Sequence, residues 1–245
     1  MPSRDSLKVA FLITWKKILS AKINYFLLLG FLILLGYIWQ KDSFSLSLKS
    51  FLHLFPYLFL FISQDMVKDE VDSGALENVL FLKGDFRRYL LVKNSFLAVV
   101  AFFCSLSIFL ILTAYGLITR QFSAFYLLQF LAGVAAGIYY LSLGGLLSFS
   151  FKGGSNVLIV ILGQVFLFIS LLLQAAQRHG FIESLDKAFF PDFFSKLKFF
   201  ALAAIFPNAV VAKRFIAYAP GIAAISLLFL ILQRAKIRNL ELQRR

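Results

Sequence analysis

Residues 90–117 read LLVKNSFLAVVAFFCSLSIFLILTAYGL, and Lys93 is their only charged residue. An α-helix advances about 1.5 Å per residue, so about 20 consecutive apolar residues suffice to cross the hydrocarbon core of a bilayer. This run is longer than that and is continuous, whereas the strands of a membrane β-barrel would alternate polar and apolar residues. The stretch therefore predicts a transmembrane helix.

The whole chain has the composition of an integral membrane protein. Its 245 residues are 60% hydrophobic and 15% charged, they include 31 Phe, and their mean hydropathy is +0.85. Soluble domains average about 45–50% apolar and about 25% charged residues. We therefore expect an all-α, polytopic membrane protein whose residues 1–245 form a single transmembrane domain.

Six apolar runs are candidate transmembrane helices, and a seventh is too short to cross. The six are residues 23–39, 51–63, 90–117, 124–151, 157–176 and 215–232, the second extending toward Met66. The short run, residues 199–212, is broken by Pro207 and lies in a long loop at 177–214. A run of this length predicts a re-entrant or interfacial hairpin before the last span.

The distribution of Lys and Arg predicts the orientation. Of the 25 basic residues, 16 lie at the N-terminus, in or beside the loop at 65–89, at Lys152 and in the C-terminal tail, and nine lie in the opposite set. By the positive-inside rule, both termini and the loop at 65–89 are cytoplasmic. We expect a plasma membrane, as in the bacterial or archaeal inner membrane. The net charge of +13 is then matched by anionic lipid headgroups rather than by nucleic acid.

The segment before the first span, residues 4–22, has an amphipathic pattern. Its apolar residues recur at helical spacing, while Lys8, Lys16 and Lys17 fall between them. Such a pattern predicts a helix lying in the headgroup plane of the membrane, the alternative being a solvated leader to the first span. The recurring apolar residues are Leu7, Phe11, Trp15 and Ile18.

We call residues 65–89 the acidic loop. Six of the twelve carboxylates of the chain lie between Asp65 and Asp85, in a protein otherwise built of apolar runs. Charge of this density cannot lie in hydrocarbon, so the loop lies in water or against protein. Leu76, Val79 and Leu80 add an apolar ridge, which suits docking into the groove of a soluble partner. The alternative is a solvated hairpin whose charges pair among themselves.

The sequence offers little support for catalysis or metal binding. No nucleophile elbow, zinc-protease or phosphate-binding motif occurs, so we expect no catalytic, cofactor or metal site in this chain. The spans carry no central Asp or Glu, which ion-coupled carriers usually need. A secondary transporter or channel, and a membrane-embedded enzyme that modifies lipids, remain the alternatives to the function inferred below.

A few embedded residues are candidates for a substrate pathway or for helix packing. They are Gln129, Gln164 and Pro207, and the sequence leaves the two roles open. The run 124–151 also has a face of small residues, which predicts close helix packing within the chain or between protomers. That face comprises Ala132, Gly133, Ala135, Ala136, Gly137, Gly144 and Gly145.

The acidic loop resembles the first cytoplasmic loop of ABC-2 type transporter permeases. In that family an acidic-x-acidic-x-Gly-Thr-Leu-Glu stretch follows the second span and precedes a turn, an Arg and a Lys. Here Ala75 stands in place of the Thr, and Phe86 in place of the Arg, with Arg87 one residue later. The matching positions are Glu70, Asp72, Gly74, Leu76, Glu77 and Lys93.

This resemblance implies a function. It implies that the chain is the membrane-spanning subunit of an ATP-driven exporter, with the acidic loop as a coupling helix that docks on a separate ATPase subunit. The docking residues would be Glu70, Asp72, Gly74, Leu76, Glu77, Leu80, Arg87 and Lys93. ATP and magnesium would bind to the ATPase, and a second permease chain, identical or homologous, would complete the pathway. The Phe-rich spans fit an amphipathic or hydrophobic cargo, such as a lipid-linked molecule, a peptide or a drug.

Overall fold

The computed structural model describes residues 22–41, 43–64, 67, 86–151, 154–177 and 200–244, and all regular elements within these ranges are helical. The expectation of an all-α protein is thus confirmed for this part of the chain. Most of the predicted amphipathic helix at 4–22 and most of the acidic loop lie outside the described residues. The elements are α2 (Lys22–Lys41), α3 (Phe44–Leu54), α4 (Pro56–Ile62), α7 (Phe86–Ile118), α8 (Phe125–Leu147), α9 (Ser155–Gln177), η1 (Pro207–Val211), η2 (Ile216–Tyr218) and α12 (Ala219–Arg244).

Four helical stretches in the described residues are long and apolar enough to cross a membrane, which indicates a membrane protein. They coincide with the second, third, fourth and sixth predicted spans, and α2 and α9 coincide with the first and fifth. The topology with six spans stays a prediction. The four stretches are Phe44–Ile62, Leu90–Ile118, Phe125–Leu147 and Ile216–Arg238.

The second span begins earlier than the sequence predicts. It starts at Phe44 rather than at residue 51, because Ser43 caps α3 by accepting a hydrogen bond from the Leu46 N–H (3.2 Å). Polar residues of α3, including Lys49, lower the mean hydropathy of residues 44–50. The sequence therefore did not mark these residues as part of the span, although they are helical. The span is divided at Phe55, where Pro56 opens α4 at a position whose N–H has no partner within the helix.

Other boundaries also differ from the prediction, and α7 begins at Phe86, four residues before residue 90. The helix α8 ends at Leu147, before residue 151, and α12 continues to Arg244, well beyond residue 232. The basic tail thus extends the last helix as far as Arg244. Its charged residues end the apolar run without ending the helix, because Arg, Lys, Leu and Gln all have good helix propensity.

The small-residue face of α8 packs against α4 within the same chain. A Cβ built on Gly133 would lie 2.5 Å from the Phe55 ring, and one on Gly137 would lie 2.6 Å from the Phe59 ring. Both rings are buried, and Phe55 also stacks on Phe130 with centroids 5.1 Å apart. The glycines therefore let the rings of Phe55, just before α4, and of Phe59 in α4 lie almost on the α8 backbone, which is the usual purpose of small residues between membrane helices.

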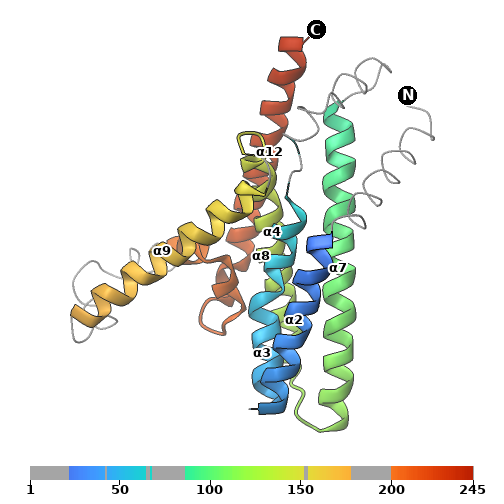
Figure 1. Cartoon of the computed structure of the whole chain (residues 1–245), viewed down its shortest axis with the longest axis vertical. Helices are drawn as coiled ribbons and strands as arrows, with labels where there is room; N and C mark the ends of the chain where they lie inside the picture. The colour runs from blue at the N-terminus through green and yellow to red at the C-terminus, as the bar shows by residue number, and fades with distance from the viewer. Residues whose placement is uncertain are drawn as a thin grey trace.

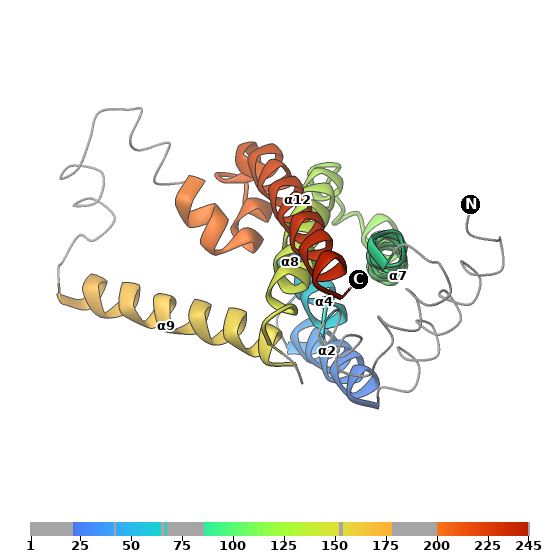
Figure 2. The same ribbon diagram turned by 90° about the horizontal axis from the view of Figure 1, so that it is seen from above.

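The helices form a bundle from which α9 projects. Figure 1 shows α12 running along α8, and Figures 1 and 2 both show α9 leaving the bundle at a steep angle. Apolar side chains on several sides of α9 are exposed, including Leu162 (57%) and Phe166 (71%). In a membrane protein such exposed apolar side chains are in contact with lipid or with another protein.

Candidate functional site

The structure describes the flanks of the acidic loop. The loop leaves α4 and re-enters at α7, and both of these ends point toward the same end of the bundle as the end of α12 (Figure 1). Arg87 is in the first turn of α7, and Lys93, two turns into the helix, is buried with 5% of its surface exposed. The other predicted docking residues, Glu70, Asp72, Gly74, Leu76, Glu77 and Leu80, lie outside the described residues.

Asn156 ties together three helices, one of which, α4, ends shortly before the acidic loop begins in the sequence. Its Nδ2 donates to the carbonyl oxygen of Ser63 at the end of α4 (3.1 Å) and to that of Gly144 in α8 (3.0 Å). The side chain is fully buried at the start of α9. The Ser63 carbonyl lies just past the end of α4, where intrahelical donors run out, whereas the Gly144 carbonyl also accepts from the Ser148 N–H (2.9 Å). One amide group thus holds the ends of α4 and α8 to α9.

Gln233 makes a second tie at the same end. Its Oε1 accepts a hydrogen bond from Asn94 Nδ2 of α7 (3.0 Å), and its Nε2 donates to the Ser142 carbonyl of α8. Because Gln233 belongs to α12, the side chain joins the last helix to two others. Buried amides of Asn156 and Gln233 therefore join α4, α7, α8, α9 and α12 in addition to their apolar contacts.

The second group of polar contacts surrounds the break before α12. Residues 200–205 are helical, Phe206 leaves the helical region (φ −116°, ψ 75°), and η1 follows at Pro207. Pro207 is buried, as are Val210 and Val211. Ending a helix in this way leaves backbone carbonyls without intrahelical donors, which is tolerated at membrane depth only where protein supplies partners.

Side chains of α8 and α9 supply these partners. Tyr139 donates its hydroxyl to the Ala204 carbonyl (2.7 Å), Gln164 Nε2 donates to the Ile205 carbonyl (2.8 Å), and Gln129 Nε2 donates to the Val211 carbonyl (2.8 Å). Thus the structure gathers the three embedded candidates of the sequence, Gln129, Gln164 and Pro207, around one break in the backbone.

Gln164 is the centre of this arrangement, which we call the glutamine hub: Gln164, Tyr57, Tyr140 and the Ile205 carbonyl. Gln164 Oε1 accepts from the Tyr57 hydroxyl (2.8 Å), while its Nε2 donates to the Tyr140 hydroxyl (2.9 Å) as well as to Ile205. The two tyrosine rings stack, with centroids 5.1 Å apart. The hub links α4, α8, α9 and the segment before Pro207, and it holds the otherwise projecting α9 to the bundle.

The break also holds amide oxygens for which no described residue provides a hydrogen-bond donor. They are Gln129 Oε1 and Asn208 Oδ1, whose amide nitrogens are occupied by the carbonyls of Val211 and His53. Among the contacts made by Asn156 and Gln233, Asn156 Oδ1 and Asn94 Oδ1 likewise have no hydrogen-bond donor from a described residue. Buried acceptors of this kind are commonly satisfied by water in proteins.

Several of these residues were not singled out from the sequence. Tyr57, Tyr140, Asn156, Asn208 and Gln233 all lie in or beside apolar runs and make the contacts described above. Isolated amides in such runs were the available signal, because a polar group inside a membrane needs a partner. The hydrogen-bond partner of each amide could not be predicted from the sequence. Most of these partners are backbone carbonyls, and which carbonyls are available depends on the tertiary structure.

Within the described residues, no group of three or more His, Cys, Asp and Glu side chains could hold a metal ion. The arrangement is one of hydrogen bonds between amides, tyrosine hydroxyls and carbonyls, which positions helices. Comparison of the chain with protein-family models, with curated proteins and with solved structures found no match.

Proposed function

We propose that this chain is the membrane-spanning permease subunit of an ATP-driven ABC transporter, coupled to a separate ATPase subunit through the acidic loop. The cargo that fits best is amphipathic or hydrophobic, and the direction is export. A second permease chain, identical or homologous, completes the pathway, and ATP and magnesium bind to the ATPase.

One observation carries the proposal: the acidic loop connects α4 and α7 where buried amides bind these helices to their neighbours. Asn156 holds the end of α4 to α8 and α9, and Gln233 holds the start of α7 to α8 and α12. A force applied to the loop would therefore reach several helices together. This is what a coupling helix needs, because domain closure in a partner has to move a rigid group of spans.

The lack of internal carboxylates favours an external energy source. No Asp or Glu occurs between residues 86 and 182, a range that contains α7, α8 and α9. Carriers driven by protons or sodium usually place such groups near the membrane midplane. A chain without them in three successive helices is better suited to energy delivered at its surface by ATP hydrolysis.

Labelling of single cysteines tests the orientation on which the proposal depends. In a Cys104→Ala background, Gln121→Cys between α7 and α8 is expected to react with a membrane-impermeant maleimide added to intact cells. Ser73→Cys in the acidic loop is expected to react only after the cells are opened. The reverse pattern would put the loop outside the cell, out of reach of a cytoplasmic ATPase.

Co-purification tests the partner. The full chain, affinity-purified in mild detergent from its own membranes, is expected to carry a vanadate-sensitive ATPase subunit. Glu77→Lys is expected to reduce the bound ATPase at least tenfold, because it reverses a charge that the resemblance assigns to the interface. Glu183→Lys, in the loop predicted on the other side of the membrane, is the matched control and is expected to retain it.

The same preparation separates the proposal from its alternatives. Reconstituted vesicles should move a lipophilic cargo only when ATP is present on the side of the acidic loop. Transport that follows a proton or sodium gradient without ATP would instead indicate a secondary transporter or channel. Chemical conversion of a lipid by the purified chain alone would indicate an enzyme.

A further inference from the structure

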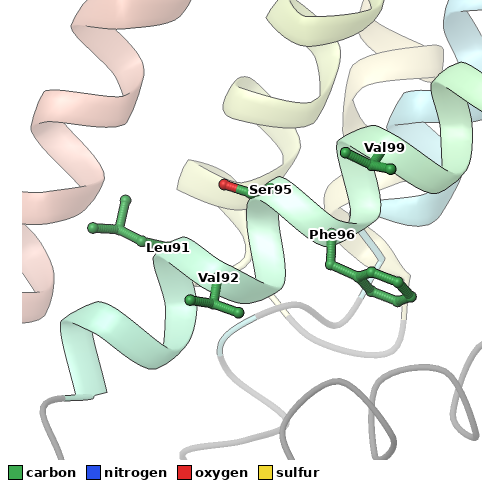
Figure 3. Close-up of a pocket in the computed structure, with 5 residues that line it drawn as sticks. All are labelled: Leu91, Val92, Ser95, Phe96 and Val99. Atoms are coloured by element: carbon green, nitrogen blue, oxygen red, sulfur yellow. The ribbon is translucent and has the colours of Figure 1, made fainter. Parts of the chain in front are cut away.

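Lys93 lies on the face of α7 that is turned into the bundle. Leu90, Lys93, Leu97 and Ala101 follow one another at helical spacing, and all four are buried. The outward face of the same turns, drawn in Figure 3, comprises Leu91, Val92, Ser95, Phe96 and Val99. Because only 5% of Lys93 is exposed, its ammonium group is directed into the bundle rather than along the outward face toward lipid phosphates.

A buried ammonium group is strongly destabilising unless it has a partner of opposite charge. Lys93 is not without a partner in the structure. The described ranges contain a single carboxylate, that of Glu241 in α12. From Gln233, which contacts Asn94 beside Lys93, α12 rises about 12 Å to Glu241. Since α7 and α12 run in opposite directions (Figure 1), Glu241 is level with the first turn of α7 rather than with Lys93.

We propose that Lys93 forms an ion pair with Asp65, the first carboxylate of the acidic loop. The pair fastens the start of the loop to α7 from inside the protein. Lys93 then holds the loop in place, instead of contacting a partner subunit as the resemblance implies. The pair does not depend on whether an ATPase binds the chain.

Hydrogen-bonded amides place the end of α4 level with Lys93. The Ser63 carbonyl shares its amide donor with the Gly144 carbonyl of α8. The Asn94 side chain, next to Lys93, shares an amide partner with the Ser142 carbonyl of α8. Two residues of α8 correspond to a rise of about 3 Å, so Ser63 and Asn94 are nearly level along the bundle. In addition, α4 packs directly against α7.

Val67 shows that the chain stays in the bundle after α4. Only 3% of this side chain is exposed, and it belongs to the same hydrophobic core cluster as Leu90 and Leu97. These two leucines are the neighbours of Lys93 on the buried face of α7. The start of the acidic loop therefore packs into the core that also surrounds Lys93.

Asp65 is bounded from both sides by described residues. It is two residues from Ser63 and two from Val67, so its Cα atom is at most about 7.6 Å from the Cα atom of either. Asp69, the next carboxylate, is six residues from Ser63 and follows Val67, so only one side is bounded in this way. Among the carboxylates of the acidic loop, Asp65 is therefore the one best placed to reach Lys93.

Reversal of the two charges tests the ion pair. Lys93→Asp and Asp65→Lys are each expected to lower the Tm of the detergent-purified chain by at least about 6 °C, because each puts two like charges together in the bundle. The double variant restores the attraction and is expected to recover at least half of the loss. Asp69→Lys is the matched control, and in combination with Lys93→Asp it should recover nothing.

Two results would overturn the inference. Losses of Tm that simply add in the double variant would show that Lys93 and Asp65 do not interact. Recovery of the Tm by Asp69→Lys, in place of Asp65→Lys, would show that Asp69 is the partner.

Cross-linking supplies a second measurement, which does not require a charge-reversed chain to fold. In native membrane vesicles and a Cys104→Ala background, Asp65→Cys is paired with Lys93→Cys and treated with a short bis-methanethiosulfonate. We expect an intramolecular product, identified by mass spectrometry, at least tenfold more abundant than with the control pair Asp65→Cys and Leu91→Cys. Leu91 is two residues from Lys93 but on the outward face, where it is 41% exposed and open to the reagent. Equal or negligible cross-linking of both pairs would show that the loop does not start beside Lys93.

Discussion

Gly137→Val lowers the stability of the protein by about 2 kcal/mol, with a fall in Tm of roughly 4 to 8 °C. The reason is the closeness of α4 and α8. The new Cβ would lie 2.6 to 2.9 Å from three ring atoms of Phe59, whose side chain is 1% exposed and has little room to move. Thermal unfolding of the detergent-purified chain, followed by the loss of the monodisperse peak in size-exclusion chromatography, measures the effect.

Gly163→Val is the matched control for this substitution. Gly163 is also within a helix, α9, but a Cβ placed there meets no atom within 4 Å. The two changes share the cost of a β-branched residue in a helix and differ only in the contact with Phe59. Adding Phe59→Leu to Gly137→Val is expected to restore part of the Tm. Equal shifts in the two single variants would mean that α4 and α8 are not in close contact.

Gln164→Leu is expected to destabilise the protein by roughly 2 kcal/mol. The reason is that Gln164 makes all three hydrogen bonds of the glutamine hub, to Tyr57, Tyr140 and Ile205. Leucine leaves the Tyr57 hydroxyl and the Ile205 carbonyl without the hydrogen bonds now measured at 2.8 Å. Gln121→Leu, at an exposed position in the loop after α7, should leave the Tm within about 1 °C.

A double-mutant cycle distinguishes the hub from a general effect of adding leucine. Tyr57→Phe removes one hydroxyl from the same hydrogen-bond group, so its effect should not add to that of Gln164→Leu. We expect the double variant to be less destabilised than the sum of the two single variants, by at least 0.5 kcal/mol. Strict additivity would show that Tyr57 and Gln164 do not interact.

Much of the fold was predictable because membrane helices follow a simple rule of length and hydropathy. The runs 23–39 and 157–176 correspond to α2 and α9 within two residues at each end. The second span was predicted too late because Lys49 and its polar neighbours masked α3, although the Ser43 cap marks its start. Hydropathy averages over a window and does not register a single capping residue.

The sequence predicted the type of contact between helices but not the residues that make it. The small residues of α8 predicted close packing, yet nothing in their spacing identified Phe55 and Phe59 as the partners. Likewise, Gln129 and Gln164 were recognisable as embedded amides, whereas their acceptors are the Val211 carbonyl at the end of η1 and the Ile205 carbonyl before the break at Phe206. Such acceptors depend on tertiary structure, so the choice between pathway and packing stayed open at the level of sequence.

The sequence distance between Gln164 and Ile205 has a consequence for the biogenesis of the protein. The two residues are 41 positions apart, so at about 5 to 20 residues per second the ribosome adds the second roughly 2 to 8 s after the first. Until then α9 has been synthesised but lacks the Ile205 carbonyl that joins it to the segment before Pro207. A chain interrupted after Gln177 would therefore lack one of the three hydrogen bonds of the glutamine hub, the one to the Ile205 carbonyl.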